Sequence, residues 1–300
     1  MLEALTMELA VPKRRLTASI EASAKQVLST DGLSGLFPAG TWVYLTDVGV
    51  DPLETTVAAA AKVSACGYVP VPHIPARRIG SRDALELRVN RFVSEAGVDN
   101  VLVIAGEADT QKGPYSASID ILRSDVLSKH GIRKIGVAGH PEGNTTIPAD
   151  IVKSSLLEKA AYAANTDAEM RIVTQFGFDA ERFITWADSL PEQGISLPVH
   201  IGMAGPAKMT TLIKYAAICG VGPSMSFLKK RGSALAALAM GFDPDPILLA
   251  VEDHVASNPF TSIKAAHVFP FGGLKKTANW LDERGSWDIK KSLYLDASVI

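Results

Sequence analysis

The sequence is built from short, continuously apolar runs that alternate with longer amphipathic segments. The run 101–104, for example, contains only valine, leucine and isoleucine. Such a strand is buried on both faces, as in a parallel sheet covered by helices. Runs of this kind alternate with helical periodicity along the chain, which predicts a (β/α)8 TIM barrel, with a doubly wound open sheet as the second choice. The predicted strands are 6–11, 41–46, 69–73, 100–106, 134–139, 170–175, 198–203 and 265–269.

The intervening segments have the periodicity of helices. No linker or change in composition divides the chain, so we predict one barrel domain over 1–300. No strand is followed by the Gly-x-Gly-x-x-Gly turn of dinucleotide-binding folds, which disfavours the open sheet. A mostly helical insert, 224–256, precedes the last strand. The predicted helices are 16–28, 52–66, 81–96, 116–129, 149–164, 180–190, 208–219 and 273–282.

Composition excludes several classes of protein. The chain has 300 residues, which suits a single barrel, typically of ~250 residues. A net charge of −2 gives no reason to expect nucleic acid or an anionic membrane. No apolar run reaches the ~18 residues that span a bilayer, and the first residues lack the pattern of a signal peptide. The two cysteines, Cys66 and Cys219, fit a reducing cytoplasm, and the scattered histidines predict no metal site.

Polar residues stand where the predicted strands end, the position at which a barrel carries its chemistry. The most informative pair is Thr174-Gln175, because packing alone does not explain a glutamine at the end of a buried strand. Its amide brings two donors and an acceptor that must be satisfied. Such a side chain suits a planar heterocycle with amide-like edges, such as a pterin or a flavin. The other polar strand-end residues are Glu8, Thr46, Asp47, His73, Glu107, His140, Glu142, His200 and His267.

Glu8 is the candidate general acid. It is flanked by apolar residues on the first predicted strand. Burial favours the protonated form of a carboxyl group, which makes it a usable acid near neutral pH. The alternative is an inward glutamate that pairs with a basic residue inside the barrel.

The order of these landmarks resembles the methylenetetrahydrofolate reductases, a family of flavin-containing (β/α)8 barrels. The resemblance runs from about residue 6 to about residue 206 and is distant. Its most specific part is 174–179, Thr-Gln-Phe-Gly-Phe-Asp, where the family has Thr-Gln-Phe-x-Phe-Asp. The other landmarks are Glu8 followed by Pro12, Thr46, Pro72-His73, Gly106-Glu107, Pro141-Glu142 and Lys159.

The resemblance implies an oxidoreductase of one-carbon metabolism and methionine biosynthesis. Its members interconvert 5,10-methylenetetrahydrofolate and 5-methyltetrahydrofolate by hydride transfer from NAD(P)H through FAD. By this resemblance Glu8 is the general acid that helps to open the imidazolidine ring. Glu107 and Gln175 bind the pterin of the tetrahydrofolate derivative.

The resemblance also implies a cofactor site, a homo-oligomer and a cytoplasmic protein. Thr46, His73, His140 and Lys159 would hold FAD, with Lys159 near the pyrophosphate. Ala105 stands where the family has arginine, so a flavin-free or non-redox barrel that binds pterin or methyltetrahydrofolate is the alternative. A lyase or isomerase of a small phosphorylated substrate is a third possibility. The choice between NADH and NADPH and the direction of the reaction stay open.

Overall fold

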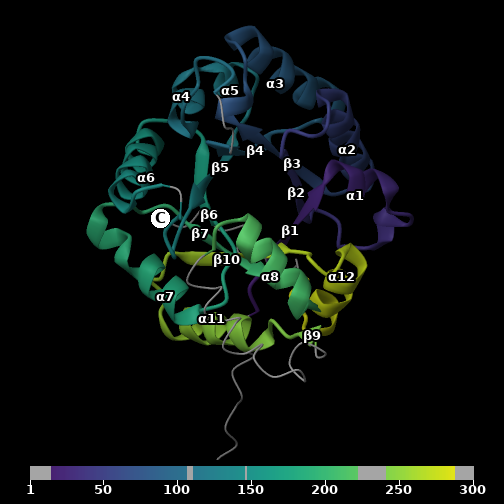
Figure 1. Cartoon of the computed structure of the whole chain (residues 1–300), viewed down its shortest axis with the longest axis vertical. Coiled ribbons are helices and arrows are strands. Elements are labelled where there is room, and N and C mark those ends of the chain that lie inside the picture. Colours follow the sequence, from purple (N-terminus) through teal and green to yellow (C-terminus); the bar gives the residue numbers. More distant parts are fainter. Residues whose placement is uncertain (1–14, 107–110, 146, 222–240, 288–300) are drawn as a thin grey trace, which may run out of the picture.

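The computed structural model of the chain describes residues 15–106, 111–145, 147–221 and 241–287. Its centre is a closed barrel of parallel strands in the order β1-β10-β7-β6-β5-β4-β3-β2, with helices around the outside (Figure 1). Each strand therefore pairs with the barrel strands that come before and after it in the chain, and the first pairs with the last. The predicted (β/α)8 barrel is confirmed. The strands are β1 Ala18–Ser23, β2 Trp42–Thr46, β3 Val69–Pro75, β4 Asn100–Ile104, β5 Lys134–Gly139, β6 Glu169–Thr174, β7 Val199–Ala204 and β10 Ile263–Phe269.

The helices that cover the barrel begin and end at recognisable signals. In α3, the Ser81 hydroxyl accepts a hydrogen bond from the Ala84 N–H, and Gly97 ends the helix in the left-handed conformation. No helix of the described ranges is long and apolar enough to cross a bilayer. The helices are α1 Ala24–Ser29, α2 Leu53–Ala65, α3 Arg82–Ala96, α4 Ser118–Arg123, α5 Val126–Lys129, α6 Ala149–Ala163, α7 Ala180–Ser189, α8 Met209–Ile218, α11 Asp245–Ser257 and α12 Leu274–Glu283, with short 3-10 helices at Leu33–Gly35, Ala76–Arg78 and Pro191–Gln193.

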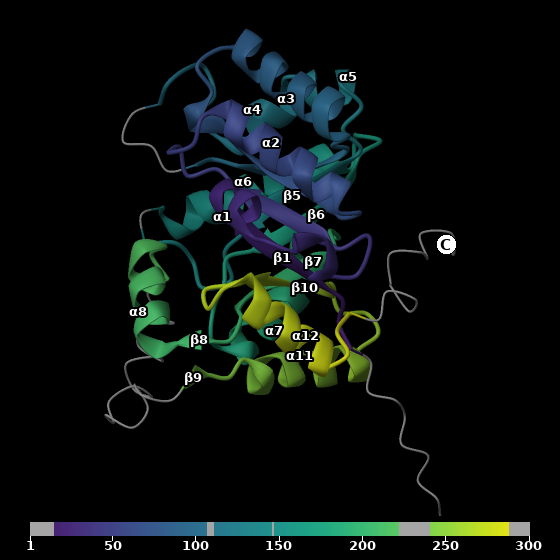
Figure 2. The same ribbon diagram turned by 90° about the vertical axis from the view of Figure 1, so that its right-hand side faces the viewer.

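The chain makes an excursion after β7. A two-residue strand, β8 Ala207–Lys208, pairs antiparallel with β9 Gly241–Phe242. Between them, α8 stands apart from the barrel strands, at the left in Figure 2. Because this excursion leaves the carboxyl end of β7, it lies at the face of the barrel where the predicted strand-end residues gather. Within the predicted insert 224–256, the structure describes β9 and most of α11, and residues 222–240 lie outside the described ranges.

The first strand of the barrel differs from the prediction. A helix was expected over 16–28, but Ala18–Ser23 is the strand that pairs with both β10 and β2, and only Ala24–Ser29 is helical. Alanine favours helices, and this misled the prediction. The strand forms because its residues alternate with a period of two, so that Ile20 and Ala22 are buried in the core between polar neighbours. The predicted strand 6–11 lies outside the described residues, and the barrel closes without it.

The barrel interior contains a buried arginine. Arg171 on β6 donates hydrogen bonds to the Tyr44 hydroxyl (2.9 Å) and to the Asn100 Oδ1 (2.8 Å), and its guanidinium carbon lies 4.5 Å from the centre of the Trp42 ring. Among the described residues no carboxylate pairs with it. The guanidinium has room because β5 carries Gly136, whose added Cβ would lie 3.4 Å from Nη2. Hydrogen bonds and ring contacts therefore stabilise this buried cation.

The ends of β6 and β7 approach each other unusually closely. The Gly202 N–H donates to the Thr174 hydroxyl oxygen at 2.7 Å. A Cβ added at Gly202 would lie 2.3 Å from the Thr174 carbonyl oxygen and 2.8 Å from the carbonyl carbon of Gln175. Only glycine fits this position, because the neighbouring atoms belong to the backbone and cannot rotate away. The contact marks the point at which β6 ends, directly before Gln175.

We predict that Gly202→Ala lowers the free energy of unfolding by about 1–3 kcal/mol, the usual cost of overpacking a rigid site. Gly35→Ala is the matched control, since an added Cβ there meets no atom within 4 Å and the backbone conformation suits alanine. We expect the control to stay within about 0.5 kcal/mol of the original chain. Urea unfolding of the three proteins measures both values. Equal stability of Gly202→Ala and the control would contradict the close contact.

Candidate functional site

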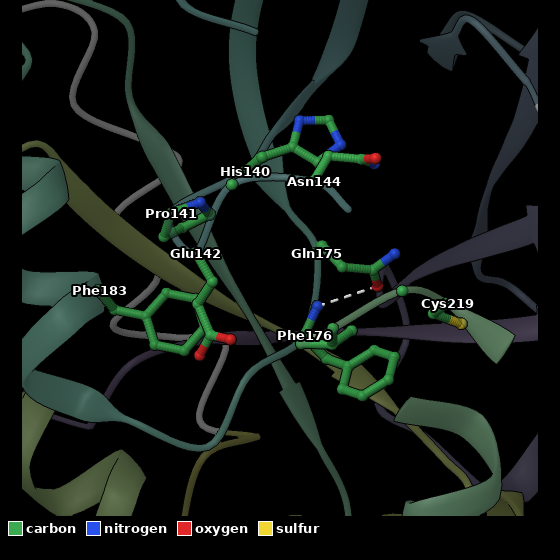
Figure 3. A pocket seen from close by; sticks show the side chains of 11 residues that line it. His140, Pro141, Glu142, Asn144, Gln175, Phe176, Phe183 and Cys219 are labelled. Carbon is green, nitrogen blue, oxygen red and sulfur yellow. Dashed lines mark hydrogen bonds between the residues drawn. The ribbon is translucent and has the colours of Figure 1, made fainter. Parts of the chain in front are cut away.

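A pocket lies at the carboxyl ends of β5 and β6, between the turn that follows β5 and the end of α8 (Figure 3). The barrel thus places it where enzymes of this architecture carry their chemistry. Its wall combines polar side chains with aromatic rings, which suits a planar ligand with polar edges. The residues that line it are His140, Pro141, Glu142, Gly143, Asn144, Gln175, Phe176, Phe183, Cys219, Gly220 and Val221.

Gln175 enters the pocket with its amide in a defined orientation. Its Oε1 accepts a hydrogen bond from the Phe176 N–H at 3.1 Å, and its amide nitrogen points away from Phe176 (Figure 3). No other hydrogen bond of this side chain occurs within the described part of the chain. The acceptor is therefore used by the backbone, while the donors remain for a ligand. Thr174 is different, since its hydroxyl serves the contact with Gly202.

Glu142 reaches the same pocket from the turn after β5. This turn is closed by a hydrogen bond from the Gly143 N–H to the His140 carbonyl at 3.0 Å, with Gly143 at a φ of +77°. The carboxylate lies over Gly177, where an added Cβ would be 2.8 Å from Oε1. The ring of Phe183 lies against the same glycine (Figure 3). Gly177, in the segment that follows β6, therefore leaves the space that the Glu142 carboxylate occupies.

His140 and Lys159 form a buried basic pair behind this turn. Burial, and then the nearby Lys159 ammonium, lowers the pKa of His140 to about 4. Burial lowers the pKa of Lys159 to about 8, against the opposing effect of Glu158. His140 is therefore neutral near pH 7 and Lys159 still mostly charged. Lys159 makes no hydrogen bond or ion pair with the described residues, although it is almost fully buried.

A second polar cluster lies inside the barrel around Glu21 of β1. The Glu21 Oε2 lies 3.1 Å from His267 Nε2 and 3.7 Å from His73 Nε2. The other nitrogen of His267 is 2.9 Å from the Ser19 hydroxyl, and its ring packs 4.4 Å from the centre of the Tyr44 ring. Burial lowers the pKa of His73, more than the carboxylate of Glu21 raises it. Glu21 thus has two imidazoles around a carboxylate that is 15% exposed.

An aromatic wall separates the cluster from the pocket. The rings of His267 and Phe269 are 4.9 Å apart, and those of Phe269 and Phe176 are 5.2 Å apart. Phe271 extends this wall to Tyr215 on α8, at 4.8 Å from Phe176 and 4.5 Å from Tyr215. A ligand that reached both the pocket and Glu21 would therefore lie against aromatic rings.

The predicted site residues fall into three groups. His140 and Gln175 meet in the pocket, with Lys159 close enough to act on His140. Thr46 and His73 lie on β2 and β3, and His73 is turned into the barrel towards Glu21 instead of ending its strand, which continues to Pro75. Glu8 and Glu107 lie outside the described residues. Gly106 is also explained, since an added Cβ would lie 2.8 Å from Pro75, so its small size serves packing.

Sequence reasoning missed Glu21 and gave no role to His267. The signal for Glu21 was the alternation Ser19-Ile20-Glu21-Ala22-Ser23, in which small or apolar residues separate polar ones. Arg171 was part of a recognised strand, but nothing in the sequence indicated its partners Tyr44 and Asn100. No cluster of side chains within the described ranges could hold a metal ion.

The fold and the pocket place the chain among (β/α)8-barrel proteins with a mixed polar and aromatic pocket at the carboxyl ends of their strands. No protein-family model matches the chain. Curated proteins do match it, among them two methylenetetrahydrofolate reductases. Methylenetetrahydrofolate reductase 1 of Schizosaccharomyces pombe is 29% identical over 133 residues, 42% of this chain and 21% of that protein. Methylenetetrahydrofolate reductase 2 of Saccharomyces cerevisiae is 26% identical over 159 residues, 50% of this chain and 25% of that protein.

These matches confirm the resemblance that the strand ends indicated: the chain is similar to the methylenetetrahydrofolate reductases. The matched part spans about a quarter or less of the length of these curated relatives. A solved structure shares the fold, with a TM-score of 0.53 over 92% of this chain and 96% of that one, at 10% identity. It is described as an uncharacterized protein from Clostridium thermocellum that binds two copies of 5-methyl-5,6,7,8-tetrahydrofolic acid.

We predict that His140 lowers the free energy of unfolding as the solution becomes acidic. Its pKa is about 4 in the folded chain, against an ordinary value of 6.5. The unfolded chain therefore gains a proton first as the pH falls, and stability is lost between pH 6.5 and pH 4. The full loss from this residue is about 3 kcal/mol.

Urea unfolding of the original chain and of His140→Asn, at pH 8 and at pH 4, measures this effect. At pH 8 both side chains are neutral, so the change between the two pH values isolates the titration. We expect the original chain to lose about 3 kcal/mol more than the variant. The same loss in both proteins would show that His140 is not held neutral by burial.

Proposed function

We propose that the chain is a folate-dependent oxidoreductase that interconverts 5,10-methylenetetrahydrofolate and 5-methyltetrahydrofolate. The observation that carries the proposal is Gln175, whose amide donors are held towards a pocket at the end of β6. A pterin offers acceptors to such donors along its polar edge. Similarity to methylenetetrahydrofolate reductases, and a fold shared with a protein described as binding methyltetrahydrofolate, support the same substrate class.

The reaction requires an acid, because opening the imidazolidine ring places a proton on the leaving nitrogen. Glu21 is one candidate, since it lies at the inner end of the aromatic wall with two imidazoles beside it. The His267 Nε2 lies 3.1 Å from the Glu21 Oε2, within hydrogen-bonding distance. Glu8 is the other candidate, on the strength of the resemblance alone.

The hydride donor in this proposal is NAD(P)H, and FAD is the proposed carrier, which when bound would accept the hydride and pass it to the folate. The residues present fit the phosphate end of such a cofactor. Lys159 is a buried ammonium with no anionic partner in the described ranges, and neutral His140 lies beside it. Lys159 would bind the pyrophosphate, and His140 would contribute a hydrogen bond without adding charge.

A second candidate is a flavin-free or non-redox barrel that binds a pterin or methyltetrahydrofolate in one-carbon or methyl-transfer metabolism. Ala105 supports it, because the resemblance places an arginine at this position in the flavin enzymes. His73 supports it too, since this side chain is turned towards Glu21 and away from the rim. In that case the pterin pocket around Gln175 would remain in use.

The absorbance spectrum of the purified protein separates these candidates. A flavin enzyme is yellow, with a band at about 450 nm that bleaches on addition of NAD(P)H or methyltetrahydrofolate. A colourless protein that oxidises NADH with methylenetetrahydrofolate would transfer the hydride directly. A protein that binds methyltetrahydrofolate without any such oxidation would be the non-redox barrel, and one that binds no folate would refute the proposal.

We predict that replacing the true acid lowers the rate of turnover by about 100-fold or more while folate still binds, since general acid catalysis usually contributes 10²–10⁴. Glu21→Gln and Glu8→Gln are compared in the same NAD(P)H oxidation assay, with methyltetrahydrofolate binding measured alongside. Loss of turnover in one variant alone identifies the acid. Normal rates in both would exclude a carboxyl acid at either position.

We predict that Lys159→Met weakens FAD binding by about tenfold or more, because charged hydrogen bonds of this kind contribute about 1.5–3 kcal/mol. The same change removes a buried, unpaired charge, so thermal stability should be equal or higher. Flavin fluorescence titration and a melting curve measure the two effects. Lys153→Met, on the exposed face of α6, is the control. Equal FAD affinity in both variants would remove Lys159 from the cofactor site.

A further inference from the structure

Three polar side chains of β1 and β10 form a connected series inside the barrel. Ser19 and Glu21 lie two residues apart on β1, and therefore on the same face of the strand. Ser19 is paired in register with His267 of β10. The Ser19 hydroxyl oxygen lies 2.9 Å from Nδ1 of His267, and Nε2 of the same ring lies 3.1 Å from Oε2 of Glu21. The imidazole thus joins the hydroxyl group to one particular oxygen of the carboxylate.

The distances determine which nitrogen of His267 carries a hydrogen. The Ser19 hydroxyl has two acceptors within reach, His267 Nδ1 at 2.9 Å and the carbonyl oxygen of Ala266 at 3.4 Å. Only the shorter distance is normal for a hydrogen bond that a hydroxyl group donates. Nδ1 is therefore the acceptor and carries no hydrogen. The ring hydrogen is on Nε2, which donates it to Oε2 of Glu21.

The two oxygens of Glu21 therefore differ. Oε2 accepts from His267, and Nε2 of His73 lies 3.7 Å from the same oxygen. Oε1 makes no hydrogen bond within the described part of the chain. The Glu21 side chain is 15% exposed, whereas His267 is fully buried and Ser19 nearly so. A ligand can therefore reach the carboxyl group but not the two groups behind it.

We propose that Ser19 is a positioning residue that acts on Glu21 through His267. It reserves Oε2 as an acceptor, so the proton of the carboxyl group is carried on Oε1. This inference rests on the proposed function, with Glu21 as the acid. When the acid reacts, the Oε1–H bond breaks, an N–H bond forms on the leaving nitrogen, and the carboxylate keeps the electron pair. The hydrogen bond that Oε2 already accepts stabilises the negative charge left on Glu21.

Nitrogen-15 NMR of the full chain tests the state of His267, because it separates a ring nitrogen that carries hydrogen from one that does not. We expect hydrogen on Nε2 and none on Nδ1. The signals that are absent from His267→Asn identify this ring among the histidines. Hydrogen on Nδ1 would overturn the inference, because Nε2 could then leave Oε2 as the oxygen that carries the proton. This measurement requires no turnover, so it does not depend on the proposed function.

A double-mutant cycle tests the action of Ser19 on the acid, with single-turnover oxidation of NAD(P)H by 5,10-methylenetetrahydrofolate as the assay. We expect Ser19→Ala to slow this step by about tenfold, the equivalent of one hydrogen bond, and to leave the affinity for 5-methyltetrahydrofolate unchanged. In Glu21→Gln the same change should have no further effect, because Ser19 acts only through the acid. Ser262→Ala is the matched control and should keep the original rate, since its hydroxyl makes no hydrogen bond to the described residues.

Four results of this cycle count against the inference. They are an unchanged rate in Ser19→Ala, an equal loss in Ser262→Ala, a loss of folate affinity that accounts for the slower rate, and a full tenfold loss from Ser19→Ala in Glu21→Gln. The last two would show a structural role only. Circular dichroism checks that each variant is folded. The proposed function itself fails if the original chain binds no folate and oxidises no NAD(P)H, and the NMR spectrum of His267 distinguishes that failure from failure of the inference.

Discussion

The close approach of β7 to the end of β6 determines the geometry of the candidate site. Because Gly202 has no side chain, its N–H reaches the Thr174 hydroxyl, and an added Cβ would meet the backbone of Thr174 and Gln175. The strand must therefore end at this point, and the Gln175 side chain turns from the barrel wall into the pocket. Gly177 extends the same principle, since its lack of a side chain makes room for the Glu142 carboxylate. Small residues on the strands thus position large polar ones.

Burial controls the charges of the site. It lowers the pKa values of His140 and His73, so neither imidazole adds a positive charge that would compete with Lys159 for an anionic ligand near pH 7. Lys159 retains most of its charge because its pKa stays above 7. Deeper in the barrel, Arg171 is hydrogen-bonded to Tyr44 and Asn100. The pocket therefore offers a small number of donors and acceptors, and these can specify a ligand.

The predicted strands 134–139 and 170–175 match β5 and β6 closely, because continuous apolar runs bounded by turn residues have few other uses. The start of the chain was harder to predict. Residues 18–23 are rich in alanine and serine, so local propensity favoured a helix, and pairing with β10 and β2 overrode it. The site followed the same division. Gln175 and His140, which the sequence singled out at strand ends, both line the pocket, whereas the position of Glu21 depended on which segment closes the barrel.

The sequence by itself determined the alternation of strands and helices, the barrel that follows from it, and the polar strand ends that resemble methylenetetrahydrofolate reductases. These properties depend on local periodicity and on residue type. The tertiary structure decided which strand ends face one another, that Glu142 shares a pocket with Gln175, and that His73 turns towards Glu21. It also decided which donors remain available, because Thr174 binds Gly202 and Gln175 binds its own neighbour. Such pairings join residues from different strands. The spacing of these residues along the chain does not predict the strand register that brings them together.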